Sequence, residues 1–282
     1  MKIFEDISLV LISYKSREKI IRFIENISKN IKIIIVDNSQ DIKLIKDMEL
    51  NKNIEIYLKP NIGYGSAANF AKSKVKTKYF LLCNPDLENL NDDKINKFYE
   101  IGNKLYPNFL ALGPNFESFK KNYKNDYSIK KKISGSCMFF NSKYFEDLGG
   151  FDENIFLYFE EDDLCRRGNK KKMFSYKINN IYIKHNVGTS VNLENNDQIK
   201  KLKELTLWHF IWSKFYFYKK HYGKIISLII FFPTISRIIY KLFYSKIISD
   251  SEENRKYKIR LSGLLNSILG KKSFKRAKLD YL

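Results

Sequence analysis

The segment KYFLLCNPD, residues 78–86, decides the fold class, because a short apolar run ends here at a proline and is followed at once by a carboxylate. An uninterrupted apolar run of this length is typical of a strand that is covered on both faces of a parallel sheet. Pro85 has no backbone N–H with which to continue a strand, so Asp86 is expected to project from the carboxyl end of the sheet. Three more runs of this kind precede the segment, at residues 7–14, 31–37 and 54–58.

Helix-like stretches separate these four predicted strands. They cover residues 17–30, 41–50 and 65–76, and a fourth follows at 91–105. Strands that alternate with helices form a parallel sheet through right-handed crossovers. The sequence therefore predicts an α/β fold with an open sheet wound by helices. Irregular strand-like segments follow from about residue 109, and a long helical region follows from about residue 198.

Small, polar or acidic residues follow each of the four predicted strands. Ligands of open α/β sheets bind beyond the carboxyl ends of the strands. We therefore expect the binding site among these residues, which are Ser13 and Tyr14, Asp37 with Asn38 and Ser39, the loop 60–69, and Asn84 with Asp86.

The stretch GYGSAA, residues 63–68, permits two interpretations. Gly63, Gly65 and Ala68 match the G-x-G-x-x-A fingerprint of dinucleotide-binding folds, in which a later acid such as Asp86 would bind the ribose. That fingerprint normally follows the first strand, whereas here it follows the third. The alternative is a tight turn before a helix whose small residues pack closely on the sheet, and the motif alone does not decide between the two.

Asp86 and His185 are the candidate metal ligands. A carboxylate at the end of a strand suits Mg²⁺ or Mn²⁺, which also bind phosphate oxygens, although N-P-D is equally ordinary in surface turns. His185 follows the strand-like stretch IYIK, and imidazole suits manganese as a third ligand beside a carboxylate and a diphosphate. A lone histidine is more often a structural residue, so the two assignments depend on each other.

The segment FLYFEEDDLCRR, residues 156–167, sets four carboxylates in a row within a basic chain. If a helix begins at Glu160, its dipole stabilises the acids of the first turn, and the arginines four residues after Asp162 and Asp163 can pair with them. Successive helix residues point in different directions, so at least one carboxylate should face the site. The aromatic residues Phe156, Tyr158 and Phe159 would raise the pKa of an adjacent carboxylate and favour a general base, whereas charge pairing would lower that pKa.

The C-terminal part carries most of the net charge of +20, because residues 214–282 hold 16 of the 51 Lys and Arg but only 4 of the 31 acids. Aromatic residues recur at helical spacing in 207–224, which predicts either a basic helix on an anionic membrane surface or a stripe that packs on the α/β domain. The apolar run 225–236 is too short to span a bilayer, which needs ~20 residues. Nucleic acid is not an expected partner, since no binding motif accompanies the charge.

The three cysteines, Cys83, Cys137 and Cys165, have no spacing typical of zinc sites or disulfide frameworks, which favours a reducing compartment. The first residues include acids and lack the small-residue cleavage site of a signal peptide. We therefore expect a cytoplasmic protein that is peripheral at the inner face of the cell membrane.

Seven stretches occur in the same order as in one known enzyme family. They are VLISYKS, IIIVDNSQD, NIGYGSAANFA, YFLLCNPD, GSCMFFNSKYFEDLGGFDE, FLYFEEDDLCRR and KHNVGTS, and they cover roughly residues 7–222. In this ordered set the chain resembles the glycosyltransferase family 2 enzymes of the GT-A fold, especially their rhamnosyltransferase-like branch. We accordingly expect a GT-A glycosyltransferase domain at 1–222 and a basic, amphipathic, membrane-associating helical tail at 223–282.

The resemblance implies roles for the residues at the strand ends. Tyr14 would lie near the base of a nucleotide-sugar donor, and Asp37 would contact the base or the ribose. The remaining residues implied in donor binding are Ser13, Asn61, Gly63, Gly65, Asn69 and Asn84.

The resemblance also implies the metal ligands and the catalytic base. Asp86 matches the last Asp of the family's D-x-D motif, whose first position here is Asn84, and His185 matches a later metal-binding histidine. Glu161 stands at the position of the catalytic Asp, and Glu160 is the second candidate. The remaining members of the motif, which would orient the acceptor or hold the structure, are Asp163 and Arg167.

The implied reaction is an inverting sugar transfer that depends on Mn²⁺ or Mg²⁺. The donor would be a dTDP- or UDP-linked sugar, with rhamnose as the branch-level expectation, and the acceptor a glycan hydroxyl on a polyprenyl diphosphate in bacterial surface polysaccharide synthesis. Three alternatives remain open. A nucleotidyltransferase would share the sheet and the metal carboxylate, an NAD-dependent Rossmann-type enzyme would use GYGSAA, and a non-catalytic protein that binds anionic membranes would need only the tail.

Overall fold

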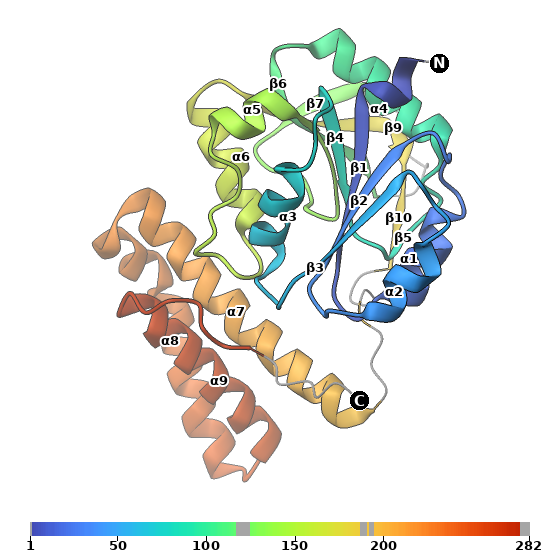
Figure 1. Cartoon of the computed structure of the whole chain (residues 1–282). Coiled ribbons are helices and arrows are strands. Elements are labelled where there is room, and N and C mark those ends of the chain that lie inside the picture. Colours follow the sequence, from blue (N-terminus) through green and yellow to red (C-terminus); the bar gives the residue numbers. More distant parts are fainter. Residues whose placement is uncertain (1, 117–124, 187–190, 192–194, 277–282) are drawn as a thin grey trace. The chain divides into compact units, whose positions relative to one another are not determined.

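The computed structural model describes residues 2–116, 125–186, 191 and 195–276 (Figure 1). The chain separates into two compact units: unit 1 comprises Met1–Asp152 and Glu160–Asn192, and unit 2 comprises Glu153–Phe159 and Leu193–Leu282. The predicted boundary at 222/223 lies inside unit 2, because the helix before it contacts the helices after it.

Unit 1 is built on an eight-stranded sheet in the order β3-β2-β1-β4-β8-β6-β9-β7. The four predicted strands are parallel neighbours, and they are β1 (Ile7–Ser13), β2 (Lys32–Asp37), β3 (Ile54–Leu58) and β4 (Tyr79–Cys83). The other strands are β6 (Phe109–Asn115), β7 (Tyr127–Lys130), β8 (Cys137–Asn141) and β9 (Phe174–Tyr182). Because β8 is antiparallel to both β4 and β6, the sheet is mixed rather than wholly parallel.

Helices cover both faces of this sheet (Figure 1). They are α1 (Arg17–Ile24), α2 (Ile42–Met48), α3 (Tyr64–Lys72), α4 (Asp92–Leu105), α5 (Ser142–Asp147) and α6 (Glu160–Lys170). One core contains Leu44 of α2 and Phe98 of α4, and the core of the other face contains Ala68 of α3 and Leu164 of α6. The strand–helix alternation predicted for the first hundred residues is confirmed.

A second, two-stranded sheet joins β5 (Leu87–Glu88) to β10 (Lys184–His185) in antiparallel register. Leu87 pairs with His185, so this sheet brings the end of β4 next to a segment that is distant along the chain. The predicted strand 181–185 is therefore divided between β9 and β10.

Unit 2 contains the predicted C-terminal helical extension. Its helices are α7 (Asn196–Tyr222), α8 (Lys224–Ile247) and α9 (Ser251–Ile268). Phe215, Phe231, Ile238 and Leu264 form the centre of its core. Gly263 allows α9 to approach α7 closely, because a Cβ at that position would lie 2.6 Å from the carbonyl oxygen of Trp208.

The aromatic stripe of α7 faces the core of unit 2. Trp208, Ile211, Trp212 and Phe215 are at most 2% exposed, and only Tyr222 of the predicted stripe is substantially exposed, at 39%. The indole N–H groups of Trp208 and Trp212 donate to Ser262 Oγ and to the Lys271 carbonyl, each at 3.2 Å. The prediction that this stripe contacts a membrane is therefore wrong for its four buried residues, because α8, α9 and the C-terminal segment cover them.

α8 is longer than the apolar run 225–236 indicates, because the helix continues past Arg237 to Ile247. Its mean hydropathy reaches 1.7 over an 18-residue window, of which only 17% is buried. By length and composition alone, α8 meets the requirement for a membrane span, which corrects the prediction that the segment is too short.

Candidate active site

Asp86 and His185 meet at the carboxyl end of β4. The Asp86 side chain is 1% exposed and that of His185 is 18% exposed, and Asp86 Oδ1 lies 3.3 Å from His185 Nε2. The Asn186 backbone N–H donates to the Asp86 carbonyl oxygen at 3.3 Å. Pairing of β5 with β10 is thus what unites the two predicted metal ligands.

This pair fits a divalent cation that is shared with a ligand. A carboxylate oxygen and an imidazole nitrogen are both suitable donors to Mn²⁺, and Mg²⁺ prefers the oxygen. Within the described residues, no group of three or more His, Cys, Asp or Glu side chains is arranged to hold a metal. Among the described residues, Asp86 and His185 are therefore the two that would hold such a cation, and phosphate oxygens and water would supply its other ligands.

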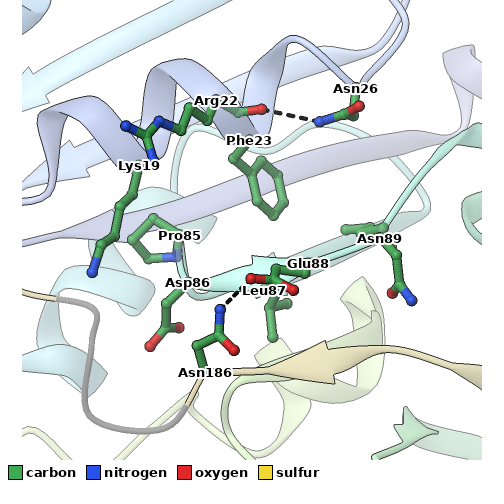
Figure 2. Close-up of a pocket in the computed structure, with 11 residues that line it drawn as sticks. Lys19, Arg22, Phe23, Asn26, Pro85, Asp86, Leu87, Glu88, Asn89 and Asn186 are labelled. Carbon is green, nitrogen blue, oxygen red and sulfur yellow. Dashed lines mark hydrogen bonds between the residues drawn. The ribbon is translucent and has the colours of Figure 1, made fainter.

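A pocket of about 240 Å³ adjoins Asp86 (Figure 2). Its walls are one face of α1, with Lys19 and Arg22, then Asn26 in the turn after that helix, and the segment from Pro85 to Leu90 with Asn186. Burial lowers the pKa of Lys19, and the charge of Asp86 partly offsets that effect. Lys19 and Arg22 were not predicted from the sequence, because their spacing of three residues puts two cations on one helix face but is also typical of a solvated helix.

Asp37 is buried at the end of β2, where its carboxylate organises two loops. It accepts hydrogen bonds from Ser39 Oγ at 2.8 and 3.0 Å and from the Asp41 N–H at 2.7 Å. Ser39 Oγ in turn accepts from the Lys15 N–H at 3.0 Å. Asp37 therefore sets the shape of the loops after β1 and β2, and its oxygens are already engaged within the chain.

The ends of β1 and β2 also hold two buried polar atoms that have no hydrogen-bond partner, Ser13 Oγ and Asn38 Oδ1. The Asn38 N–H donates to the Ser13 carbonyl oxygen at 2.8 Å, so the two residues are neighbours. Tyr14, which follows Ser13, is partly buried. An unsatisfied buried polar atom costs ~1–3 kcal/mol, which makes this strand end a strained place where a ligand is expected.

The GYGSAA segment forms a turn and a closely packed helix. Gly63 has φ 93°, and its N–H donates to Asn61 Oδ1 at 3.3 Å. A Cβ on Gly65 would approach the Cβ atoms of Phe151 and Glu160 to 3.1 and 3.5 Å. These contacts explain both glycines without a dinucleotide, in agreement with the second interpretation of the motif.

Asn69 has a structural task on α3. Its Nδ2 donates to the Phe151 carbonyl oxygen and its Oδ1 accepts from the Phe151 N–H, both at 2.9 Å. Both ends of the amide thus hold the turn that follows α5. Asn69 therefore has a structural role, and it is not among the residues proposed to bind the donor.

Glu160 and Glu161 begin α6; Glu160 is buried and Glu161 is partly buried. Burial, together with the charge of Glu161, raises the pKa of Glu160 well above its ordinary value, and Glu160 Oε2 has no hydrogen-bond partner. Burial raises the pKa of Glu161 to about 7, although a hydrogen bond from the Gly135 backbone and the charge of Lys132 act in the opposite direction. A carboxyl group with a pKa near 7 can exchange a proton at neutral pH.

The loop 134–136 connects Glu161 to the end of β4. The Glu161 carboxyl group lies against Gly135, while the Ser136 carbonyl oxygen accepts from the Asn84 N–H at 2.9 Å. Tyr64 Oη donates to the Gly135 carbonyl oxygen at 2.7 Å, which ties the start of α3 to the same loop. Asn84, Glu161 and the turn at Gly63 are therefore held together by one backbone segment of unit 1.

The aromatic residues Phe156, Tyr158 and Phe159, which precede Glu160 in the chain, belong to unit 2. Their rings pack in unit 2 against α7: Phe156 lies 4.6 Å from His209, and Tyr158 and Phe159 each lie 5.6 Å from Phe210. The pKa of Glu161 is raised, with burial as the largest cause, which is one of the two outcomes that the sequence left open. The sequence also did not reveal that Tyr158 and Phe159 have positive φ angles of 68° and 71°, which bulky residues rarely adopt.

Asp163 and Arg167 form a structural pair. Arg167 Nε lies 2.7 Å from Asp163 Oδ2, and the Asp163 side chain is fully buried. The other guanidinium nitrogens donate to the carbonyl oxygens of Leu148 and Gly150 at 2.5 and 2.6 Å. This pair fixes the turn after α5, whereas Asp162 pairs with Lys132 at 3.0 Å rather than with Arg166 as predicted.

Comparison with known proteins identifies the fold of this arrangement. No protein-family model matches the chain. In sequence, the chain is 25% identical over 197 residues to the low-salt glycan biosynthesis hexosyltransferase Agl10 of Haloferax volcanii. That match covers 60% of this chain and 63% of Agl10, which is less than two thirds of that relative's length.

Several solved structures are similar to the chain, among them the following three. The mannosyltransferase PcManGT from Pyrobaculum calidifontis, in complex with GDP-Man and Mn²⁺, has a TM-score of 0.58 at 9% identity, over 95% of this chain and 88% of that one. S. aureus TarS has a TM-score of 0.51 at 11% identity, over 94% and 92%. GalNAc-T7 with UDP, GalNAc and Mn²⁺ has a TM-score of 0.53 at 10% identity, over 75% and 49%. The predicted GT-A-type fold is confirmed, and at these identities the structures establish the fold alone.

Proposed function

We propose that the protein is a glycosyltransferase that moves a sugar from a nucleotide-diphosphate donor to a hydroxyl group of a glycan. One observation carries the proposal: the loop 134–136 ties a carboxyl group with a pKa of about 7 to the strand end that bears the Asp86–His185 pair. Glycosyl transfer needs a proton acceptor close to a site for a charged leaving group. The similarity to the hexosyltransferase Agl10 supports the same activity.

Glu161 is the proposed general base. Its carboxylate takes the proton of the acceptor hydroxyl, the hydroxyl oxygen forms a bond to the anomeric carbon, and the bond from that carbon to the nucleoside diphosphate breaks with inversion. The acceptor hydroxyl gives up its proton to Glu161 while the nucleoside diphosphate leaves with the electron pair of the broken bond, so charge is conserved in the step. Glu160 is the less suitable base, because its side chain is buried, whereas that of Glu161 is only partly buried and more accessible to an acceptor.

The leaving diphosphate is proposed to bind at Asp86 and His185. A divalent cation held there would neutralise the charge that develops on the leaving group. Lys19 and Arg22 line the pocket beside Asp86 and can attract the same phosphates. Ser13, Tyr14 and the loops held by Asp37 are proposed to form the nucleoside end, with Asn61, Gly63, Gly65 and Asn84 shaping the backbone around the donor.

The finer assignments extend this proposal. The donor is proposed to be dTDP- or UDP-linked, with rhamnose as the first sugar to test, and the acceptor to be a glycan on a polyprenyl diphosphate in bacterial surface polysaccharide synthesis. The exposed apolar side chains of α8 support a location at a membrane surface, and the cytoplasmic face is the one proposed. The positive φ of Gly63 and the close packing at Gly65 account for both glycines without a dinucleotide, which favours the glycosyltransferase proposal over the NAD-dependent alternative.

The test is a donor panel on the purified protein. Thermal shifts with UDP-, dTDP- and GDP-sugars, with and without Mn²⁺, should single out one donor class whose stabilisation depends on the metal. His185→Ala should weaken that metal-dependent part by about 10–100-fold in affinity. Stabilisation by NAD and by none of the nucleotide sugars would overturn the proposal.

A further inference from the structure

α8 carries two apolar stripes on opposite sides. The inner stripe consists of Ser227, Phe231, Ile238 and Ser245, which are at most 2% exposed. Phe231 packs edge-on against Phe215 of α7, with ring centroids 5.1 Å apart. The serine hydroxyls donate to carbonyl oxygens within the chain, at 2.7 Å for Ser227 and 3.1 Å for Ser245. The inner stripe of α8 is therefore already packed and hydrogen-bonded within unit 2.

The outer stripe faces solvent along the whole helix. Its large apolar residues recur at spacings of three, four and seven, and they are Ile225 (76% exposed), Ile229 (67%), Phe232 (67%), Ile239 (57%), Phe243 (68%) and Ile247 (65%). Such spacings place side chains on one face of a helix. A continuous exposed apolar face of this kind marks an interaction surface, because soluble surfaces rarely leave one uncovered.

Basic residues flank the outer stripe. Lys224, Arg237 and Lys246 are exposed, and the sequence of α8 contains no Asp or Glu. Tyr240 and Tyr244 lie beside the stripe with exposures of 60% and 43%, and tyrosine is enriched where an apolar phase meets water. An apolar stripe with cationic edges and interfacial tyrosines is complementary to a bilayer that bears anionic headgroups.

We propose that the outer face of α8 docks the protein on an anionic lipid bilayer, with the helix lying in the interface parallel to the membrane. This surface replaces the aromatic stripe of α7 as the membrane contact. Docking through α8 deepens the membrane location that is part of the proposed function, and it rests on that function only for its biological role. Vesicle binding is measured without turnover, so the two can be tested separately.

The contacts of α8 favour an interfacial helix over a membrane span. To cross a bilayer, α8 would have to leave α7 and α9 and expose Phe231 and Ile238, which are buried in the core of unit 2. It would also carry Arg237 and Lys241 into the hydrocarbon, where cations are costly. Lys241 instead lies 3.6 Å from Glu253 of α9. A second copy of the chain is a poorer occupant of the face, because docking of two copies would bring the same basic edges together.

The experiment uses the full chain and sedimentation with two kinds of vesicle, phosphatidylglycerol and phosphatidylcholine. The wild type should bind phosphatidylglycerol vesicles, more weakly as salt rises, and phosphatidylcholine vesicles at least tenfold more weakly. The double substitution Ile229→Asp with Phe232→Asp should lower binding at least tenfold. Ile42→Asp and Leu50→Asp are the matched controls, because these residues are 64% and 95% exposed in unit 1, and both should bind as the wild type does.

A second variant separates the apolar and the charged contributions. Replacing Lys224, Arg237 and Lys246 by Ser should remove the preference for phosphatidylglycerol and leave the residual binding to phosphatidylcholine. Thermal melts of all variants should match the wild type, since every substituted side chain is exposed.

Three results would overturn the inference. The first is wild-type binding in the double variant. The second is retention on vesicles after extraction at pH 11, which indicates a span. The third is a dimer in solution that the double variant abolishes, together with no vesicle binding by the wild type. Donor-dependent turnover with a water-soluble acceptor should be unchanged in the double variant, so the enzyme proposal and the docking proposal can fail separately.

Discussion

Two regions reverse the usual distribution of side chains between interior and surface. Unit 1 buries acidic side chains, and the outer face of α8 in unit 2 exposes apolar ones. Asp37, Asp86 and Glu160 are at most 5% exposed, whereas Ile225 and Ile229 of α8 are 76% and 67% exposed. A buried carboxylate and an exposed apolar stripe both lower stability unless a partner compensates. The two regions differ in that partner, which is proposed to be a small charged donor in unit 1 and a lipid surface in unit 2.

The largest effect is expected at Glu161 in unit 1. Glu161→Gln should lower turnover by ~10²–10⁴, because positioned proton transfer contributes that much, while donor affinity and vesicle binding remain near wild type. Single-turnover kinetics with a donor titration measure both quantities. Glu160→Gln is the matched control and should keep turnover within tenfold of wild type. The opposite result for the two variants would assign the base to Glu160.

Arg167 tests whether burial of a carboxylate always indicates a ligand site. Arg167→Ala removes the ion pair with the fully buried Asp163 and the two hydrogen bonds that the guanidinium donates to the carbonyl oxygens of Leu148 and Gly150. Breaking a buried pair costs ~3–5 kcal/mol, so the free energy of unfolding in urea should fall by about that amount. Lys132→Ala removes the partner of Asp162, but Lys132 is 65% exposed, so the loss there should stay below ~1 kcal/mol. A loss of similar size in both variants would contradict the structural role assigned to the Asp163–Arg167 pair.

The pH dependence of turnover tests the ionisation of Glu161 without a substitution. Glu161 must be ionised to accept a proton, and its pKa is raised to about 7, so the rate should rise with pH and level off above that value. The expected change is roughly tenfold per pH unit on the acidic side. Steady-state rates at saturating donor between pH 5 and 9 measure it. A flat profile from pH 5.5 upward would mean that the base has an ordinary carboxyl pKa.

The smallest expected effect is a stability gain in Glu160→Gln. A carboxyl group whose pKa is raised on folding binds its proton more tightly in the folded state, so stability falls as the pH rises from its ordinary pKa towards the raised one. The variant lacks this loss, and its advantage in Tm should therefore grow from pH 5 to pH 8. A gain of ~1 kcal/mol would appear as roughly 2–4 °C. A difference in Tm that is constant across this range would argue against a strained carboxyl group.

Sequence reasoning succeeded where one short segment contains all the information. The apolar runs and the polar residues after them predicted β1 to β4 and the strand ends that hold Asp37 and Asp86. The spacing of Asp163 and Arg167 predicted their ion pair. Helix and strand periodicity depends on neighbours in sequence, so such features survive in a single chain without any tertiary knowledge.

Sequence reasoning failed where a contact depends on packing. The register of β4 against β8 brings Cys83 and Cys137 within 3.8 Å as free thiols, and nothing in their spacing indicated that. The aromatic side chains of α7 and the isoleucines of α8 are both apolar sets at helical spacing, and the sequence left open whether the set in α7 packs or lies exposed; the structure buries that set and exposes the isoleucines. An amphipathic pattern shows that a face needs cover but does not show what covers it.

The sequence by itself determined the strand–helix order, the acidic and glycine-rich strand ends, and the concentration of positive charge near the C-terminus. Only the tertiary structure decided that β5 and β10 unite Asp86 with His185, that burial raises the pKa of Glu161 to about 7, and that α8 presents the exposed apolar face. The physical reason is that periodicity and turn chemistry are local, whereas burial and proximity are properties of surfaces that meet only when distant segments pack together.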